Sequence, residues 1–288
     1  MRHQHKTMLF KCLSILPKSL GDYIYGKLQY FANRNSILNK IKLSKITFDK
    51  TVKICQDLNY DLSSKTLLEI GSGWYPILPY YFVFFGKIKT VYTYDINEHY
   101  NKNAIKKFNS IFSEFNNSKF SYPKNVYNLP KNIIYFPKTD IITAQIPIAD
   151  VIFSRYVLSH MNEKDIVDFH HKLKNSLPKG TIIIHFISPS DLRQHNDRSI
   201  SLQDFLQYSK KQWNNIQTRF DYHNRLRLPQ FIQIFNQVGI EIVHLDYKFD
   251  SIDSENQKLF SKVTLHQDFQ NFSKEELTAS NIIVVLKL

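Results

Sequence analysis

From residue 65 onward, short apolar segments alternate with helical segments, and this alternation restricts the chain to few folds. Strand–helix–strand units of this kind require a parallel sheet with helices on both faces. We therefore predict an α/β fold whose seven-stranded sheet is mostly parallel. The predicted strands are 66–70, 91–95, 133–136, 151–153, 181–186, 240–247 and 282–288. The predicted helices between them are 77–85, 100–115, 164–175 and 229–238.

The end of the chain departs from simple alternation. No clear helix separates the strands at 240–247 and 282–288, so we predict that the last strand is antiparallel. Two polar and aromatic stretches, 188–228 and 249–280, are too long for ordinary connections. We interpret both as insertions with a function, within a domain that spans 61–288.

Residues 1–60 are predicted to be helical, because apolar residues recur there every three to four positions. Pro17 and Gly21 interrupt any long continuous apolar stripe. The favoured interpretation is a helical cover over one end of the sheet. The alternative is a basic amphipathic segment that makes a peripheral contact with a membrane. Neither interpretation specifies an oligomeric state.

The net charge of +13 raises the question of a nucleic-acid partner. The lysines are scattered and accompany no nucleic-acid-binding motif, so we expect no specific nucleic-acid binding. Cys12 and Cys55 lie in no metal-site spacing, which is typical of a reducing compartment. No apolar run is long enough to cross a bilayer, and the first residues do not resemble a signal peptide. We therefore expect a cytoplasmic protein.

The first predicted strand ends in an acidic residue and a glycine loop, Glu69-Ile70-Gly71-Ser72-Gly73. In open α/β sheets, ligands bind beyond the carboxyl ends of the strands, near the point where the strand order reverses. Glycines there let a ligand approach the backbone closely. A dinucleotide site favours a third glycine, whereas this chain has Pro76 at that position. The carboxylate of Glu69 also disfavours a pyrophosphate and favours a cofactor with positive charge.

This acidic-x-Gly-x-Gly segment after a strand resembles the motif of class I, Rossmann-like S-adenosylmethionine-dependent methyltransferases. The resemblance covers about residues 65–288, and 149–161 looks like the family's fourth strand and the loop that follows it. It implies that the cofactor is S-adenosyl-L-methionine, whose sulfonium and ammonium groups are cations. The implied cofactor residues are Glu69, Gly71, Ser72, Gly73, Asp95, Ile96, Asp140, Ile141 and Arg155.

Two further acids follow predicted strands in the order that this cofactor requires. Asp95 ends the second strand, where a carboxylate can accept hydrogen bonds from both ribose hydroxyls. Asp140 follows the third strand and can accept from the adenine amino group, with the N–H of Ile141 on a ring nitrogen. Taken singly, each acid has an alternative interpretation: Glu69 could cap a helix, Asp95 could be a solvated strand end, and Asp140 could be a turn residue. Their joint order favours the cofactor site.

Within that family, the chain resembles a bacterial subgroup of mostly unassigned substrate. Its members look like tailoring enzymes for polysaccharide, lipid or small-metabolite pathways. The resemblance lies in 71–76, 191–201 and 222–227. Leu192 stands where the subgroup tends to have a histidine, and Leu228-Pro229 stands where Ser-Asp is usual. We expect a small-molecule, sugar or lipid-linked acceptor, and the sequence does not identify it further.

His160 follows the fourth predicted strand, at the mouth of the predicted pocket. Methyl transfer from a sulfonium is an in-line displacement, so positioning supplies much of the rate. A hydroxyl nucleophile usually also needs a base near neutral pH, and histidine is the commonest one. His160 is therefore the candidate catalytic base for O-methylation. The alternative is a histidine that only hydrogen-bonds the local backbone.

The first insertion carries the candidate substrate contacts. Arg225 and Arg227 project to one side if the chain is extended, and arginine suits a carboxylate or phosphate. The alternative for both is an ion pair with an acid such as Asp221. His195 and Asp197 could orient an imidazole, and no third ligand stands at a metal-site spacing, so we expect no metal. The candidates are His195, Asp197, Tyr222, Asn224, Arg225 and Arg227.

The leading function is methylation of a small hydroxylated or amino-bearing metabolite, a sugar or a lipid-linked intermediate. The first alternative is a catalytically silent binding or regulatory subunit, because the intact motif indicates cofactor binding and not turnover. The second alternative is a nicotinamide-dependent oxidoreductase, which Pro76 disfavours.

Overall fold

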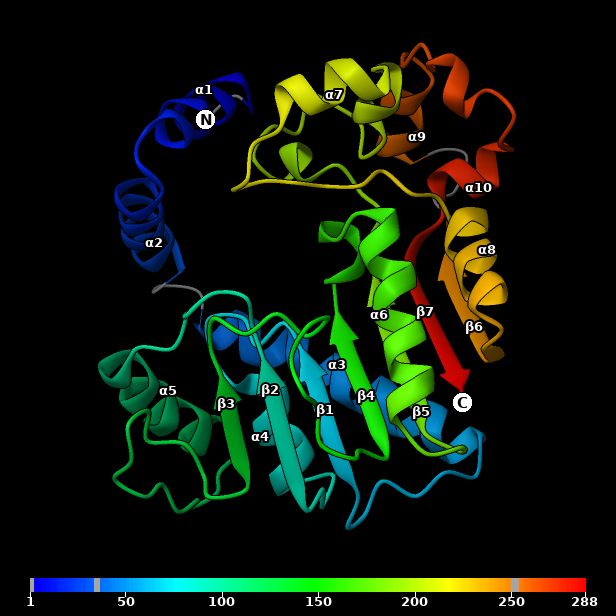
Figure 1. The fold of residues 1–288 in the computed structure, drawn as a ribbon. Helices are drawn as coiled ribbons and strands as arrows, with labels where there is room; N and C mark the ends of the chain where they lie inside the picture. Colours follow the sequence, from blue (N-terminus) through cyan, green and yellow to red (C-terminus); the bar gives the residue numbers. More distant parts are fainter. Residues whose placement is uncertain (1–2, 34–36, 250–253) are drawn as a thin grey trace. The chain divides into compact units, whose positions relative to one another are not determined.

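The structure is a computed structural model that describes residues 3–33, 37–249 and 254–288 (Figure 1). Its strands are β1 (Thr66–Ile70), β2 (Thr90–Tyr94), β3 (Ile133–Phe136), β4 (Val151–Arg155), β5 (Ile182–Ile187), β6 (Glu241–Lys248) and β7 (Ser280–Lys287). In the described residues they form a seven-stranded sheet of order β3-β2-β1-β4-β5-β7-β6. β1 is parallel to β2 and β4, β2 is parallel to β3, and β6 and β7 are antiparallel. The predicted α/β class, sheet and antiparallel last strand are confirmed.

Helices flank the sheet and also occur in both predicted insertions. They are α1 (His3–Ile15), α2 (Lys18–Asn33), α3 (Ile37–Asp57), α4 (Ile77–Phe84), α5 (Lys102–Phe115), α6 (Glu163–Ser176), α7 (Lys210–Ile216), α8 (Leu228–Val238), α9 (Glu255–Phe260) and α10 (Lys274–Thr278). The predicted helices are present as α4, α5, α6 and α8. α8 ends at Gly239, whose left-handed φ of 70° is the usual way in which a glycine stops a helix.

The chain forms two compact units. The first unit consists of Met1–Lys27, Arg155–Lys174 and Ile184–Lys287. The second unit consists of Leu28–Ser154, Asn175–Ile183 and Leu288. The predicted boundary between a helical cover at 1–60 and a domain at 61–288 stays a prediction.

The second unit has an aromatic core in which α4 and α5 pack together. α4 directly follows the glycine loop and is apolar around its circumference, so most of its side chains are buried. The ring of Tyr80 lies 5.2 Å from that of Phe108 and 5.3 Å from that of Phe112, both on α5. Phe82 meets Phe153 of β4 edge to face, with ring centroids 5.1 Å apart. Aromatic pairs in these geometries add stability beyond their buried area, so this packing fixes the start of α4.

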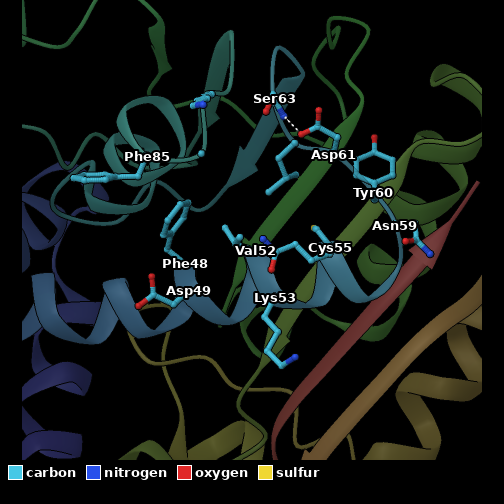
Figure 2. A pocket seen from close by; sticks show the side chains of 14 residues that line it. Phe48, Asp49, Val52, Lys53, Cys55, Asn59, Tyr60, Asp61, Ser63 and Phe85 are labelled. Atoms are coloured by element: carbon cyan, nitrogen blue, oxygen red, sulfur yellow. Dashed lines mark hydrogen bonds between the residues drawn. The ribbon is translucent and has the colours of Figure 1, made fainter.

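A cavity of about 640 Å³ lies in the second unit, beside the turn that leads into the amino end of β1 (Figure 2). Phe48 and Val52 of α3 line one side of it, and Tyr60 and Phe85 contribute further aromatic surface. Cys55 also lines it, and burial raises the pKa of its thiol to about 12. None of the residues predicted to bind cofactor or substrate lines this cavity.

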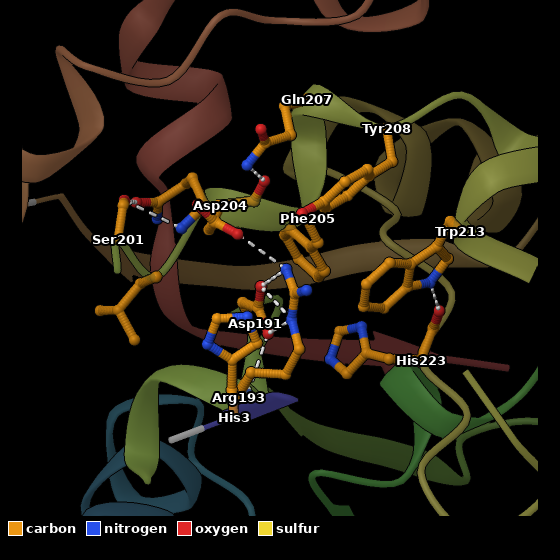
Figure 3. Close-up of polar contacts among 12 residues, drawn as sticks. His3, Asp191, Arg193, Ser201, Asp204, Phe205, Gln207, Tyr208, Trp213 and His223 are labelled. Atoms are coloured by element: carbon orange, nitrogen blue, oxygen red, sulfur yellow. Dashed lines mark hydrogen bonds and ion pairs between the residues drawn. The ribbon is translucent and has the colours of Figure 1, made fainter. Parts of the chain in front are cut away.

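In the first unit, the two predicted insertions share one hydrophobic core. Phe205 and Trp213 of the first insertion meet edge to face, with ring centroids 5.5 Å apart. Arg193 stacks over Trp213 and forms ion pairs with Asp191 and Asp204, at 2.7 and 2.9 Å (Figure 3). The insertions are therefore one packed layer and not two separate loops. The buried core side chains are Phe205, Leu206, Trp213, Phe260, Phe269 and Leu277.

His170 of α6 and His185 of β5 form a fully buried pair in the first unit. Their Nε2 atoms lie 3.0 Å apart, and the Nδ1–H of His170 donates to the carbonyl of Ile166 at 2.7 Å. The neutral ring of His170 therefore accepts a hydrogen bond from the Nε2–H of His185. Burial lowers the pKa of His170 to about 4 and that of His185 well below its ordinary value.

We predict that this pair makes the protein lose stability as the pH falls from about 6.5 towards 4. Histidines in the unfolded chain bind a proton near pH 6.5, whereas the folded pair resists protonation to lower pH. The free energy of unfolding should fall by up to about 1.4 kcal/mol per histidine and pH unit. Urea unfolding at a series of pH values measures this slope. It should become shallower in His170→Gln and stay unchanged in His171→Gln, an exposed neighbour. Equal slopes in His170→Gln and the wild type would contradict the assignment.

Candidate functional site

The loop between β1 and α4 has a backbone conformation that glycine adopts readily. Gly71 and Gly73 have φ angles of 81° and 61°, in the left-handed region. The N–H of Gly71 donates to the carbonyl of Tyr94 in β2 at 2.8 Å. Apart from Gly73 itself and its two chain neighbours, no described residue has a heavy atom within 4 Å of the position that a Cβ on Gly73 would take. A ligand can therefore approach the main chain closely at this point.

The glycine loop lies at the point where the strand order reverses. β1 is hydrogen-bonded to β2 on one side and to β4 on the other (Figure 1). The first three strands therefore extend from β1 in one direction, and β4 begins the other. In open α/β sheets, ligands bind in the crevice outside the carboxyl ends of the strands at such a switch point. The predicted cofactor loop is thus where this fold class places a ligand.

Glu69 is a buried carboxylate at the end of β1, 4% exposed. Its Oε2 accepts a hydrogen bond from the hydroxyl of Thr93, whose oxygen lies 2.6 Å from that of Ser72. Thr93 has one hydroxyl proton and gives it to Glu69, so Ser72 donates to Thr93. Burial raises the pKa of Glu69 to about 8, although the hydrogen bond from Thr93 acts in the opposite direction and lowers it. None of the ion pairs formed among the described residues includes Glu69, so this carboxylate is suited to a cationic ligand.

Asp95 follows β2 and contacts the same loop. Its Oδ2 accepts from the N–H of Gly73 at 3.3 Å, and its Oδ1 accepts from the N–H of Asn97 at 2.9 Å. Burial raises the pKa of Asp95, and His99, whose Nε2 lies 3.6 Å from Oδ1, opposes that shift. The next residue, Ile96, is 70% exposed. The carboxylate of Asp95 can accept hydrogen bonds from hydroxyl groups of a ligand. The exposed side chain of Ile96 beside it can pack against the face of a ring in the same ligand.

Asp140 and Ile141 follow β3, close to the end of β2. The N–H of Thr139 donates to the carbonyl of Asp95 at 2.9 Å, which joins the two strand ends. Asp140 is exposed, and its Oδ1 accepts from the N–H of Ile142 at 2.9 Å, whereas Ile141 is buried. One edge of the second unit thus carries all the predicted cofactor residues except Arg155. Those residues are Glu69, Gly71, Ser72, Gly73, Asp95, Ile96, Asp140 and Ile141.

Two side chains outside the predicted set, Thr93 and His99, contact these acids. Thr93 stands opposite Glu69 in the register of β1 and β2. His99 lies against the ring of Trp74, with ring centroids 4.5 Å apart. The sequence carries a signal for Thr93 only in retrospect, as a polar residue two positions before Asp95 on a buried strand. It carries none for His99, which lies in a loop.

His160 lies in η1 (Leu158–His160), the turn that follows β4 in the first unit. Its Nδ1 is 2.8 Å from the carbonyl oxygen of Tyr222. Because a carbonyl only accepts, Nδ1 carries the hydrogen, and the lone pair of the neutral ring is on Nε2. The side chain is exposed. The two interpretations of His160 are therefore compatible, since the backbone contact orients a nitrogen that can accept a proton.

Asn224 holds the turn that carries His160. Its Nδ2 donates to the carbonyls of Leu158 and Met161 at 2.7 and 2.8 Å, and its Oδ1 accepts a further main-chain N–H. Its own N–H donates to the carbonyl of Ser159 at 3.0 Å. Asn224 thus uses its side chain to position the turn. Its predicted contact with substrate stays a prediction.

His223 lies beside His160, with ring centroids 5.7 Å apart, but its surroundings differ. It is buried, and burial keeps its pKa well below the ordinary histidine value. Its Nδ1 accepts from the N–H of Arg225 at 3.4 Å. Of these two neighbouring histidines, the exposed His160 is therefore the one suited to exchange a proton with a substrate.

The two predicted substrate arginines are directed into the insertion core. Arg225 donates to the carbonyls of Phe205 and Tyr208, and it is 6% exposed. Arg227 is fully buried and donates to three main-chain carbonyls, the shortest bond being 2.7 Å to Pro189. Burial lowers the pKa of both guanidinium groups, to about 10 and about 9. In this structure both arginines therefore join segments of the insertion layer.

The remaining predicted substrate residues are dispersed over the first insertion. Asp197 accepts from the N–H of His3 at 3.2 Å and lies 2.9 Å from its Nδ1. His195 is exposed, and its pKa is lowered, first by partial loss of hydration and then by the charge of Arg198. Tyr222 contributes its carbonyl to His160. The structure thus brings Tyr222 and Asn224 to His160 and places the others elsewhere, so a shared substrate surface stays a prediction.

Arg155 ends β4, and its guanidinium lies 4.7 Å from the ring centroid of Tyr156. Asp221, the acid considered as a partner of the arginines, accepts instead from the N–H and hydroxyl of Thr218, each at 2.7 Å.

Residues 3–33, 37–249 and 254–288 contain no cluster of His, Cys, Asp or Glu that could hold a metal ion. Within the same ranges, no helix has the length and apolar character needed to cross a bilayer.

No protein-family model and no curated protein sequence matches the chain. Among solved structures, it is similar to an S-adenosylmethionine-dependent methyltransferase from Clostridium acetobutylicum, with a TM-score of 0.49 and 12% identity over 91% of this chain and 98% of the other. It is also similar to magnesium protoporphyrin IX methyltransferase from Synechocystis with bound S-adenosylhomocysteine. That similarity has a TM-score of 0.48 and 12% identity over 86% and 85% of the two chains. Because these identities and scores are low, we assign no activity from them.

We predict that Asn224→Asp changes the tautomer of His160. In the variant, a carboxylate oxygen replaces the Nδ2 group that donates to the carbonyls of Leu158 and Met161. An oxygen cannot donate to these carbonyls, so the turn is released and the hydrogen bond from His160 to Tyr222 weakens. ¹⁵N NMR of the histidine rings should show the Nδ1–H tautomer in the wild type. It should show a shift towards the Nε2–H tautomer, which free histidine prefers, in the variant.

The matched control is Asn214→Asp, at an exposed position of α7 whose side chain contacts Gln217. It should keep the wild-type tautomer. If all three proteins showed the same tautomer, Asn224 would not position His160.

Proposed function

We propose that this chain is an S-adenosylmethionine-dependent methyltransferase that acts on a small-molecule, sugar or lipid-linked acceptor. One observation carries the proposal: the carboxylate of Glu69 is buried beside two left-handed glycines and pairs with no cation of the described residues. An unpaired charged carboxylate is costly in a buried site, so this position favours a ligand with positive charge. S-adenosylmethionine has an ammonium and a sulfonium, and it fits this requirement.

The same edge of the sheet is less suited to a nicotinamide dinucleotide. Pro76 precedes α4 and has no N–H to offer to a pyrophosphate, which dinucleotide sites bind at a helix N-terminus. The sheet also differs from the dinucleotide-binding order 3-2-1-4-5-6, because β7 lies between β5 and β6. We therefore rank an oxidoreductase below a methyltransferase.

In this proposal, the ends of neighbouring strands hold different parts of the cofactor. Glu69 attracts the ammonium, and Asp95 accepts hydrogen bonds from the ribose hydroxyls. Asp140 and Ile141 contact the adenine, with Ile96 as an apolar surface. The glycine loop lets the cofactor lie against the main chain. Arg155, at the end of β4, is the remaining proposed contact.

The proposed reaction is O-methylation with His160 as the base. Bound S-adenosylmethionine supplies an electrophilic methyl group on its sulfonium. Nε2 of His160 takes the proton of the acceptor hydroxyl, while Nδ1–H remains bonded to the carbonyl of Tyr222. That carbonyl also stabilises the imidazolium that results, because a positively charged donor forms a stronger hydrogen bond. The remaining alternative is a silent subunit that binds the cofactor without transfer.

We predict that the affinity for S-adenosylhomocysteine rises with pH between about 6.5 and 8. Glu69 is mostly protonated below pH 8 in the free protein, whereas the bound ammonium favours its ionised form. Binding below pH 8 must then release a proton, and affinity should rise by up to about tenfold per pH unit. Calorimetric titrations in buffers of different ionisation enthalpy measure both the affinity and the released proton.

Glu69→Gln should weaken binding and remove its pH dependence, whereas Glu163→Gln, at an exposed position of α6, should bind as the wild type does. NADH, titrated in parallel, should not bind. Tight binding of NADH together with no binding of S-adenosylhomocysteine would overturn the proposed cofactor.

A transfer assay separates a working enzyme from a silent subunit. Incubation with methyl-tritiated S-adenosylmethionine and a bacterial metabolite extract should transfer label to an acceptor. His160→Ala should lower the transfer by about 100-fold or more, the usual contribution of a general base, and leave the affinity for S-adenosylhomocysteine nearly unchanged. His171→Ala, which removes an exposed histidine of α6, is the control. Full transfer by His160→Ala would exclude the histidine as base, and no transfer by any protein with intact cofactor binding would favour the silent subunit.

A further inference from the structure

The helices α1 and α2 are fixed to the first insertion through one face. The rings of Phe10 and Tyr25 pack on Phe220, with centroid distances of 6.1 and 4.6 Å. Arg219, the neighbour of Phe220, forms an ion pair with Asp22 at 3.2 Å. These contacts hold α1 and the part of α2 that belongs to the first unit, and side chains on the other side of each helix are exposed.

The uncovered face carries large apolar side chains. In α1, Met8 and Ile15 are 67% and 83% exposed, and with the exposed Cys12 they recur at the spacing i, i+4, i+7. This spacing places the three on one stripe of the helix. In α2, Leu20 and Tyr23 are 47% and 63% exposed. Leu20 and Tyr23 are three residues apart and therefore lie on one side of α2. An exposed apolar stripe of this kind marks an interaction site.

Lysines accompany these apolar side chains. Lys11, Lys18 and Lys27 are all exposed. The Nζ of Lys27 lies 5.4 Å from the ring centroid of Tyr23, so charge and apolar surface are adjacent. Asp22 is the only acid in the sequence of the two helices, and its charge is compensated by an ion pair. The exposed face is therefore cationic as well as apolar.

We propose that this face of α1 and α2 docks on an anionic membrane surface and lies in its plane. Interfacial helices combine an apolar stripe, which enters the acyl boundary, with lysines, which contact anionic headgroups. Tyrosine and lysine suit the headgroup level because their long side chains end in polar groups. α1 and α2 have 13 and 16 residues, fewer than the roughly 20 that a spanning helix needs.

Other occupants match this surface less well. A second copy of the chain, packed through the same face, would bring the two sets of lysines together, and like charges oppose such an interface. A nucleic acid would use the lysines, but its phosphate backbone offers nothing to the exposed stripe of Met8 and Ile15. An anionic membrane satisfies both the charge and the apolar stripe.

Co-sedimentation of the full chain with vesicles tests the proposal. We expect binding to vesicles of phosphatidylglycerol and phosphatidylcholine, and little binding to phosphatidylcholine alone. The variants Ile15→Ser/Leu20→Ser and Lys11→Glu/Lys27→Glu should each weaken binding by about tenfold or more. Circular dichroism confirms that each variant is folded.

Matched controls change the same chemistry elsewhere. Ile148→Ser alters an apolar side chain that is 75% exposed, and Lys119→Glu/Lys124→Glu makes the same change in net charge at exposed positions. Both controls should bind vesicles nearly as the wild type does. Equal weakening by the charge control and by Lys11→Glu/Lys27→Glu would show attraction to overall charge and would overturn a defined docking face.

Cys12 lies on the proposed face and provides a second measurement in the wild-type protein. It is exposed, whereas Cys55 is buried with a raised thiol pKa, so an environment-sensitive thiol-reactive dye should label Cys12. Its emission should increase and shift to shorter wavelength with anionic vesicles and stay unchanged with neutral ones.

Three further results would contradict the proposal, and none depends on methyl transfer. The first is a Cys12 dye that stays in water while the protein sediments with the vesicles. The second is a dimer in light scattering that Ile15→Ser/Leu20→Ser dissociates, which would assign the face to a second copy. The third is tight nucleic-acid binding that only the lysine variant loses, without any vesicle binding.

Discussion

Parallel pairing of β3, β2, β1 and β4 is the constraint on which the candidate cofactor site depends. Because the strands run in the same direction, their carboxyl ends share one edge, and residues far apart in the sequence meet there. The register sets Glu69 opposite Thr93, whose hydroxyl holds the carboxylate. If the pairing register of β1 against β2 shifted by one residue, the side chain of Glu69 would lie on the opposite face of the sheet from that of Thr93. The hydrogen-bond ladder thus decides both the place of the acid and its surroundings.

The sequence predicted this part of the fold well because its signals are local. Apolar runs bounded by glycine, proline and polar residues identified the strands. The antiparallel direction of the last strand was also predicted, but for a wrong reason, because the short helices α9 and α10 do precede β7. The glycine loop was equally readable, since Gly71 and Gly73 take the left-handed conformation that other residues avoid. Once the strands were assigned, Asp95 and Asp140 had to follow strand ends at the same edge.

The first insertion was less predictable, because its side chains find partners that are distant in the sequence. The spacing of Arg225 and Arg227 is the same whether they face a ligand or a core, and the structure directs both to main-chain carbonyls. The role of Asn224 depends on the turn at Leu158, which belongs to another segment. Composition could show that the insertion was polar and aromatic, but it could not show which polar groups were buried.

A crystal structure with bound S-adenosylhomocysteine tests the central claim most directly. The account predicts that the ribose hydroxyls lie within hydrogen-bond distance of Asp95, with the ammonium beside Glu69 and the adenine near Ile96 and Asp140. Two results from a crystal grown with saturating ligand would contradict the account. One is that no ligand is bound at the glycine loop, and the other is that the ligand occupies the cavity beside the amino end of β1, which Figure 2 shows.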